Sequence, residues 1–198
     1  MAGSHSRKDS GRDKRKQCAL LLIDFMNPFD YAGAELLAPR AIRAAQNAGR
    51  LKARMRAARV PVIYANDNFG RWESDFEAVV ANCRERGGAS AKIVELLAPA
   101  AGDRSILKPR HSAFFGTPLE FLLDELSADT LVLTGISADS CIMFTAHDAY
   151  LRKYGLWIPQ DCVASERDSY RRNALAYMER VLKADTRAST AARARGRR

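Results

Sequence analysis

Three side chains capable of acid–base or nucleophilic chemistry each follow a predicted strand: Asp24, Lys108 and Cys141. In an open parallel sheet the carboxyl ends of the strands meet at one edge, where ligands bind. A carboxyl, an amine and a thiol at that edge predict nucleophilic catalysis by sulfur, with Asp24 as the base that takes the thiol proton. Taken singly, they have structural interpretations: a loop-capping acid, a solvated lysine and a packed helix residue. Only their joint position favours catalysis.

Cys141 is the predicted nucleophile among four cysteines. It opens a predicted helix, where unpaired backbone N–H groups and the helix dipole stabilise a thiolate. The ammonium of Lys108 would act in the same direction. Cys18 and Cys162 lie within strand patterns and are predicted core residues, whereas Cys83 lies in a predicted loop.

Strand-like and helix-like segments alternate along the chain. A short apolar run that ends in an acid at 18–24 is typical of a strand buried on both faces of a parallel sheet, and 129–136 is the clearest strand pattern in the chain. Residues 33–59 show apolar side chains at helical spacing. Further strands are predicted at 60–66, 105–109 and 156–164, and further helices at 91–97, 117–126, about 142–154 and 166–183. This order predicts a three-layer Rossmann-like α/β fold, a parallel sheet with helices on both faces. Residues 67–88 are expected to form a long excursion with at most one short helix, a length typical of functional loops.

The net charge of +9 is concentrated at the two ends of the chain. Residues 1–16 contain six Lys or Arg and two Asp, a net of +4, and residues 183–198 contain six Lys or Arg and one Asp, a net of +5, so the middle is neutral. We therefore predict one domain at 17–183 between a basic disordered tail at 1–16 and a basic C-terminal tail at 184–198. The tails alone would attract nucleic acid or an acidic partner, so no nucleic-acid partner is expected for the domain.

Other classes of protein are disfavoured by simple patterns. The longest apolar run, residues 19–23, is far shorter than the roughly 20 residues of a spanning helix, and no apolar signal-peptide core follows the basic start. The four cysteines form no CxxC pair and the three histidines no ligand-spaced cluster, which argues against a structural zinc site. We expect a cytoplasmic protein with free thiols, no membrane association, no metal and no cofactor.

Three blocks of the sequence resemble the catalytic blocks of the isochorismatase-like cysteine hydrolases. They are LLIDFMNPF at 21–29, LKPRHSAFFGTPL at 107–119 and TGISADSCIMFTAHDA at 134–149. The blocks occur in the family's order at the matching strand ends, and the fold order agrees over nearly the whole neutral middle. The resemblance implies a sheet of about six parallel strands and an Asp-Lys-Cys catalytic triad of Asp24, Lys108 and Cys141.

The resemblance also implies a backbone feature and a state of assembly. A non-proline cis peptide is expected at Ile136–Ser137, which would direct the N–H groups of Ser137 and Cys141 at one point and form an oxyanion hole. Relatives commonly form dimers or tetramers, so we expect a homo-oligomer.

Two departures from family patterns narrow the expected reaction. Family members that hydrolyse nicotinamide share an Asp-x-His pair and a further His that bind a metal, but residues 66–69 here are Asn, Asp, Asn and Phe. Isochorismatases of the siderophore pathway lack the nucleophilic cysteine, which is present here as Cys141. The resemblance therefore implies a hydrolase of small amide, urea or carbamoyl substrates through a covalent acyl-enzyme.

Substrate contacts are predicted from aromatic residues near the strand ends. Phe29, Phe69, Trp72 and Phe115, together with Phe25, are candidates for an aromatic wall over the pocket, although packing or a subunit contact explains them equally well. Arg71 and Arg110 are candidates for binding a substrate carboxylate, with solvated side chains as the alternative. Other functions remain open: a nicotinamidase, or a non-catalytic ligand-binding protein in which Cys141 senses oxidants.

Overall fold

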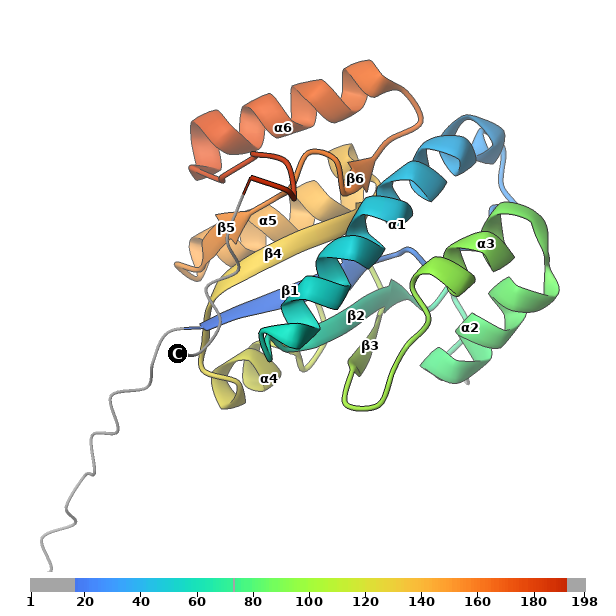
Figure 1. The fold of residues 1–198 in the computed structure, drawn as a ribbon, viewed down its shortest axis with the longest axis horizontal. Coiled ribbons are helices and arrows are strands. Elements are labelled where there is room, and N and C mark those ends of the chain that lie inside the picture. Colours follow the sequence, from blue (N-terminus) through green and yellow to red (C-terminus); the bar gives the residue numbers. More distant parts are fainter. Residues whose placement is uncertain (1–16, 73, 192–198) are drawn as a thin grey trace, which may run out of the picture.

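The computed structural model describes residues 17–72 and 74–191, which form one parallel sheet between two layers of helices (Figure 1). The six strands run in the order β3-β2-β1-β4-β5, and β6 also pairs with β4. This arrangement confirms the predicted three-layer α/β fold. The strands are β1 (Gln17–Ile23), β2 (Val62–Asp67), β3 (Arg104–Lys108), β4 (Ala128–Ile136), β5 (Gly155–Trp157) and β6 (Val163–Ala164).

The described residues form six α-helices and one π-helical turn, of which α6 follows the last strand and the others lie between strands. They are α1 (Ala34–Ala57), α2 (Phe76–Glu85), α3 (Gly88–Leu96), α4 (Leu119–Glu125), η1 (Ala138–Ile142), α5 (Met143–Leu151) and α6 (Asp168–Leu182). Figure 1 shows α1 crossing in front of the sheet and α5 lying behind it. None of the helices in the described part of the chain is long and apolar enough to cross a membrane.

The continuous apolar sequence of β1 is explained by its two buried faces. Leu20 and Leu22 pack into the cluster formed with α1, α2 and α3, whereas Leu21 and Ile23 pack into the cluster formed with α4, α5 and α6. Successive side chains of a strand point to opposite faces, so a central strand needs apolar residues at every position. β1 pairs with β2 on one side and β4 on the other, and all three end near the same edge.

Cys83 and the segment 156–164 differ from their predicted secondary structure. The excursion expected at 67–88 contains all of α2, in agreement with at most one short helix, and the N-terminus of α2 is capped by the Asp75 side chain, which accepts from Ala78 N at 2.7 Å. Cys83 is therefore a buried residue of this helix and not a loop residue. The single strand expected at 156–164 is divided into β5 and β6, which pair with successive parts of β4.

The prediction of a C-terminal tail from residue 184 is wrong for residues 184–191, which pack against the domain. Asp185 pairs with β5, its backbone N donating to Leu156 O at 2.9 Å and its carbonyl accepting from Ile158 N at 2.8 Å. The Trp157 indole donates to Arg187 O at 3.0 Å. Composition alone could not show these backbone contacts. The predicted tail at 1–16 and residues 192–198 lie outside the described residues.

Candidate active site

Asp24 lies directly after β1, where the chain turns out of the sheet. Its backbone is left-handed (φ 51°), a conformation that Asp and Asn adopt more readily than most residues, and its N–H donates to Ala65 O at 3.1 Å. The residue is 4% exposed, and Oδ1 accepts from the backbone N of Asp67 at 2.6 Å. The carboxylate is thus fixed between the ends of β1 and β2.

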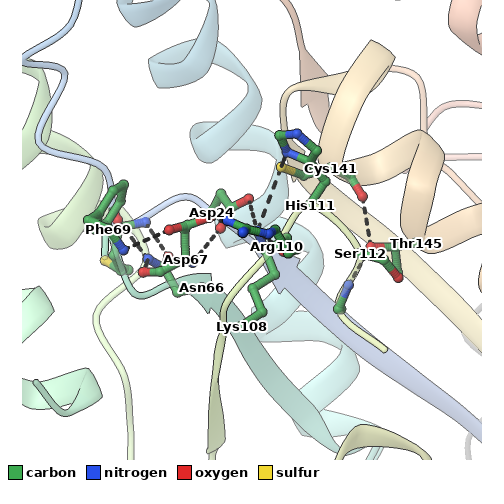
Figure 2. Close-up of polar contacts among 12 residues, drawn as sticks. Asp24, Asn66, Asp67, Phe69, Lys108, Arg110, His111, Ser112, Cys141 and Thr145 are labelled. Carbon is green, nitrogen blue, oxygen red and sulfur yellow. Dashed lines mark hydrogen bonds and ion pairs between the residues drawn. The ribbon is translucent and has the colours of Figure 1, made fainter. Parts of the chain in front are cut away.

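Lys108 is the last residue of β3, and its side chain is completely buried (0% exposed). Nζ lies 2.8 Å from Asp24 Oδ2, 3.5 Å from Asp67 Oδ2 and 3.2 Å from the carbonyl oxygen of Arg110. Figure 2 shows the ammonium group between these carboxylates and the sulfur of Cys141, which is 3.7 Å away. A buried charge of this kind requires the partners that surround it.

Cys141 lies in η1, directly before α5. The preceding turn begins at a cis peptide bond between Ile136 and Ser137, as the family resemblance implied. The carbonyl of Ser137 accepts from Ile142 N at 3.1 Å, and the carbonyl of Cys141 accepts from Thr145 Oγ1 at 2.7 Å. The structure therefore brings Asp24, Lys108 and Cys141 together at the carboxyl edge of the sheet (Figure 2).

The protonation of the three groups differs from the sequence prediction. Burial, followed by the charge of Asp24, raises the pKa of the Cys141 thiol to about 12, and the opposing effect of Lys108 does not compensate. The predicted stabilisation of a resting thiolate is therefore wrong, because the sulfur is removed from water and faces a carboxylate. The resting sulfur carries its proton.

Burial also influences the pKa values of the two charged neighbours of Cys141, Asp24 and Lys108. Burial raises the pKa of the Asp24 carboxyl, while Lys108 and a hydrogen bond from the Cys141 thiol act in the opposite direction. Burial, the largest single influence, would lower the pKa of Lys108, but the charges of Asp24, Cys141 and Asp67 and a hydrogen bond to Asp24 together outweigh it, so the pKa is raised overall. Asp24 is thus a stronger base than an exposed carboxylate, and it is close enough to Cys141 that each group shifts the pKa of the other.

A second polar cluster holds the turn before Cys141. Asp139 accepts hydrogen bonds from the hydroxyls of Ser137 and Ser165, the latter at 2.5 Å. Ser165 follows β6 and is buried, so this cluster connects η1 to the neighbouring strand. It fixes Ser137, one of the two predicted oxyanion-hole residues.

Three further residues of the site were missed by the sequence analysis. Asp67 contacts Lys108, and the exposed His111 places Nδ1 3.7 Å from the Cys141 sulfur. Tyr31 lies close enough that, after burial and Glu166, the charge of Asp24 raises the pKa of its phenol. Asp67 and His111 could have been found by their positions, since one ends β2 and the other follows Lys108 by three residues. Tyr31 stands in a loop with no comparable signal.

The predicted aromatic wall is not formed as one surface. Phe25 is a core residue, Trp72 is 79% exposed and Phe115 is 60% exposed. Phe69 lines a cavity of about 220 Å³ beside α2, and Phe29 lines a separate one of about 410 Å³ beside α1. Within the described ranges no ring contact joins these aromatic residues.

The residues at the end of β2 do not suit the metal site of nicotinamide-hydrolysing relatives. Asn66 hydrogen-bonds both the backbone N and O of Met26, and Asp67 faces Lys108. In the part of the chain that the structure describes, no three His, Cys, Asp or Glu side chains are arranged to hold a metal ion.

Known proteins resemble this chain over most of its length. The family model of the isochorismatase domain matches residues 18–190. The uncharacterized isochorismatase family protein YaaI of Bacillus subtilis (strain 168) is 38% identical over 167 residues, covering 84% of this chain and 91% of that protein. Maleamate amidohydrolase of Pseudomonas putida is 34% identical over 153 residues, covering 73% and 71% of the two chains.

A solved structure agrees with these matches. The N-carbamoylsarcosine amidase from Thermoplasma acidophilum superimposes with a TM-score of 0.68 at 28% identity, covering 87% of this chain and 96% of that chain. The fold, the order of the blocks and the family match lead to one conclusion. The chain belongs to the isochorismatase family of hydrolases.

Proposed function

We propose that this protein hydrolyses a non-peptide C–N bond of a small amide, urea or carbamoyl compound through a covalent Cys141 acyl-enzyme. The observation that carries the proposal is the convergence of Asp24, Lys108 and Cys141, with Lys108 Nζ 2.8 Å from the carboxylate and 3.7 Å from the sulfur. The names of the maleamate amidohydrolase and the N-carbamoylsarcosine amidase support this type of bond as the target.

In the first half-reaction Asp24 takes the proton of the Cys141 thiol while the sulfur attacks the substrate carbonyl. The raised pKa of the thiol makes this transfer necessary, and the raised pKa of Asp24 makes the carboxylate a suitable acceptor. Lys108 stabilises the charge that develops on sulfur. The N–H groups of Ser137 and Cys141 receive the oxyanion, and the Ser137–Asp139–Ser165 cluster holds this turn in place.

The tetrahedral intermediate then breaks its C–N bond. Protonated Asp24 returns its proton to the departing amine or ammonia, leaving a thioester on Cys141. Water hydrolyses the thioester and restores the thiol. This scheme requires no dissociable cofactor.

Substrate contacts remain those expected from the sequence, with Tyr31 added. Phe29 and Phe69 line cavities near the strand ends, and we assign Trp72 and Phe115 to the outer rim because both are largely exposed. The exposed guanidinium groups of Arg71 and Arg110 are the candidates for binding a carboxylate of the substrate. The four cysteines form no disulfide with one another within the described residues, and such reduced thiols suit the reducing cytoplasm, where we place the reaction.

The test is ammonia release from maleamate, N-carbamoylsarcosine, nicotinamide and simple ureas by the wild-type protein and the Cys141→Ser variant. We expect turnover of at least one amide or carbamoyl compound and a loss of about 10³-fold or more in the variant, the scale seen when a covalent nucleophile is removed. Equal rates in both proteins would end the covalent scheme.

The oxidant-sensing alternative has less support. A redox-sensing cysteine reacts as an accessible thiolate, whereas burial and the Asp24 carboxylate raise the pKa of the Cys141 thiol to about 12. Hydrolysis is therefore the function that the site favours.

A further inference from the structure

His111 is a second basic side chain in contact with the nucleophile. Its Nδ1 lies 3.7 Å from the Cys141 sulfur, and its ring stacks on Phe144 of α5 with centroids 5.3 Å apart and planes inclined by 23°. The segment that carries it is held at Arg110, whose carbonyl accepts from Lys108 Nζ at 3.2 Å. The imidazole is therefore positioned both by stacking and by the loop that follows β3 (Figure 2).

His111 and Asp24 meet the sulfur in different surroundings. Asp24 is 4% exposed, and its two oxygens already accept from Lys108 Nζ and Asp67 N. His111 is exposed to solvent. The imidazole is therefore the basic group on the solvent side of the sulfur, whereas the Asp24 carboxylate lies on its buried side.

We propose that the two half-reactions use different bases, and that His111 is the general base that activates water against the Cys141 thioester. This inference rests on the covalent mechanism proposed above. Asp24 serves the acylation step, in which the thiol proton moves to the leaving group.

The deacylation step balances with this chain's residues and water alone. His111 takes a proton from water as the oxygen adds to the thioester carbonyl carbon, giving a tetrahedral oxyanion. Collapse breaks the C–S bond, the acid product leaves, and the imidazolium returns its proton to the sulfur. A neutral imidazole with Nδ1 free to accept is the tautomer that this step uses.

The two half-reactions are separated by 4-nitrophenyl acetate, which acetylates thiols without any specific recognition. One equivalent of 4-nitrophenolate in a rapid burst reports acetylation of Cys141, and the following steady state reports hydrolysis of the acetyl-enzyme. The burst is compared in the wild-type protein and in the variants His111→Gln, His111→Ala and Cys141→Ala. His147→Gln is the matched control, since His147 bonds Met143 O at 2.8 Å and Tyr177 OH at 3.3 Å on the surface of α5 and α6.

We expect both His111 variants to keep the burst and to lose about 10²-fold or more in the steady-state rate, the usual contribution of a general base. Intact mass spectrometry should then show the acetyl group accumulating on Cys141. Added imidazole should restore deacetylation in His111→Ala, which a merely structural role of His111 would not allow. His147→Gln should behave as wild type.

The inference is overturned if the His111 variants deacetylate at the wild-type rate, or if burst and steady state fall by the same factor without rescue by imidazole. These outcomes leave the proposed function intact as long as wild type forms acetyl-Cys141 and releases ammonia from an amide. Absence of ester turnover and of any acetyl adduct in wild type, together with no ammonia release from any amide, would remove the covalent mechanism, and this inference with it.

Discussion

The protonation of the Cys141 thiol is the main difference between the observed site and the site expected from its residue types. A cysteine at a helix start beside a lysine predicts a thiolate, yet the Cys141 sulfur is buried and faces the Asp24 carboxylate. Residue type and spacing do not report how much water reaches a sulfur atom. The identity of the three groups could therefore be predicted, whereas their resting charges could not.

Alkylation of Cys141 by iodoacetamide should show that Asp24 suppresses its ionisation. Replacing Asp24 with Asn removes the negative charge that raises the pKa of the thiol, so alkylation at pH 8 should become about tenfold faster or more while hydrolysis is lost. Peptide mapping by mass spectrometry measures the reaction at Cys141 itself.

Lys108→Met is the opposite control for this measurement. It removes the charge that lowers the pKa of the thiol, so alkylation should become slower. Circular dichroism is needed for both variants, because either one leaves a buried partner unpaired. Slower alkylation in Asp24→Asn would contradict the assignment of Asp24 as the neighbouring charge.

The pH dependence of turnover should reveal the raised pKa of Asp24. The carboxylate must be ionised to accept the thiol proton, so kcat/KM should fall with decreasing pH at a value above 3.8. Because the folded protein holds this proton more tightly than the unfolded chain, the stabilisation from Asp24 protonation is complete below pH 3.8 and is lost as the pH rises through the folded pKa.

Protonation of Asp24 at low pH should therefore reduce activity, but it should not destabilise the folded protein. Initial rates and circular dichroism recorded in the same buffers test this separation. If the fall of kcat/KM at low pH occurred at or below pH 3.8, burial would not raise the pKa of the Asp24 carboxyl.

At the scale of elements, the approach of β1 to β4 determines the position of the site. Gly135 has φ +137°, and a Cβ at this position would lie 2.0 Å from the carbonyl oxygen of Ile23. Asp24 follows Ile23 in the chain, and Ser137 lies two residues beyond Gly135. The positions of the Asp24 carboxylate and of the turn before Cys141 therefore depend on a contact that only glycine permits.

Gly135→Ala should lower the free energy of unfolding by about 3 kcal/mol or more, because the new methyl group meets backbone atoms that cannot move aside. Urea denaturation provides the measurement. Gly102→Ala is the matched control, since Gly102 also has a positive φ (+85°) but no atom within 4 Å of the added Cβ. Similar losses in both variants would show that backbone conformation, and not the close approach, dominates at Gly135.

The strands that are buried on both faces could be predicted from the sequence. The apolar runs of β1 and β4 indicate strands buried on both faces, and their order with the helices indicates a parallel sheet. The one short helix allowed within 67–88 was not placed from the sequence, although Asp75 caps α2 and its buried residues follow helical spacing, because α2 is short and follows a polar, glycine-containing turn. The division between β5 and β6 depends on pairing with β4, which a single segment does not encode.

At the scale of the whole molecule, residues 184–191 close one side of the domain. Besides the contacts of Asp185 and Arg187 with β5, Ser189 Oγ donates to Asp161 Oδ2 at 2.8 Å and Ser189 is buried. The net contribution of each such hydrogen bond to the free energy of unfolding is about 1 kcal/mol. The domain therefore extends past the boundary expected from charge.

A chain that ends at residue 183 should lose about 2–4 kcal/mol of unfolding free energy, since several of these bonds are removed together. Thermal denaturation followed by circular dichroism measures the loss. A chain that ends at residue 191 retains all of these contacts and serves as the control. Equal stability of the two truncated proteins would contradict a structural role for 184–191.

Assembly of the protein remains an expectation at this scale. The exposed apolar side chains of Phe121, Phe144 and Leu151 on α4 and α5 are compatible with a dimer or tetramer. Light scattering coupled to size-exclusion chromatography gives the mass directly, and a monomer at micromolar concentration would contradict the expectation.

The pairing of Asp185 with Trp157 also protects the protein from uncontrolled self-association. β5 and β6 are only three and two residues long, and the backbone groups of β5 that face away from β4 are occupied by the chain around Asp185. A foreign strand consequently finds no long row of free donors and acceptors on this border. Shortened forms of the protein should therefore tend to form fibrils or precipitates, a hazard separate from any loss of catalysis.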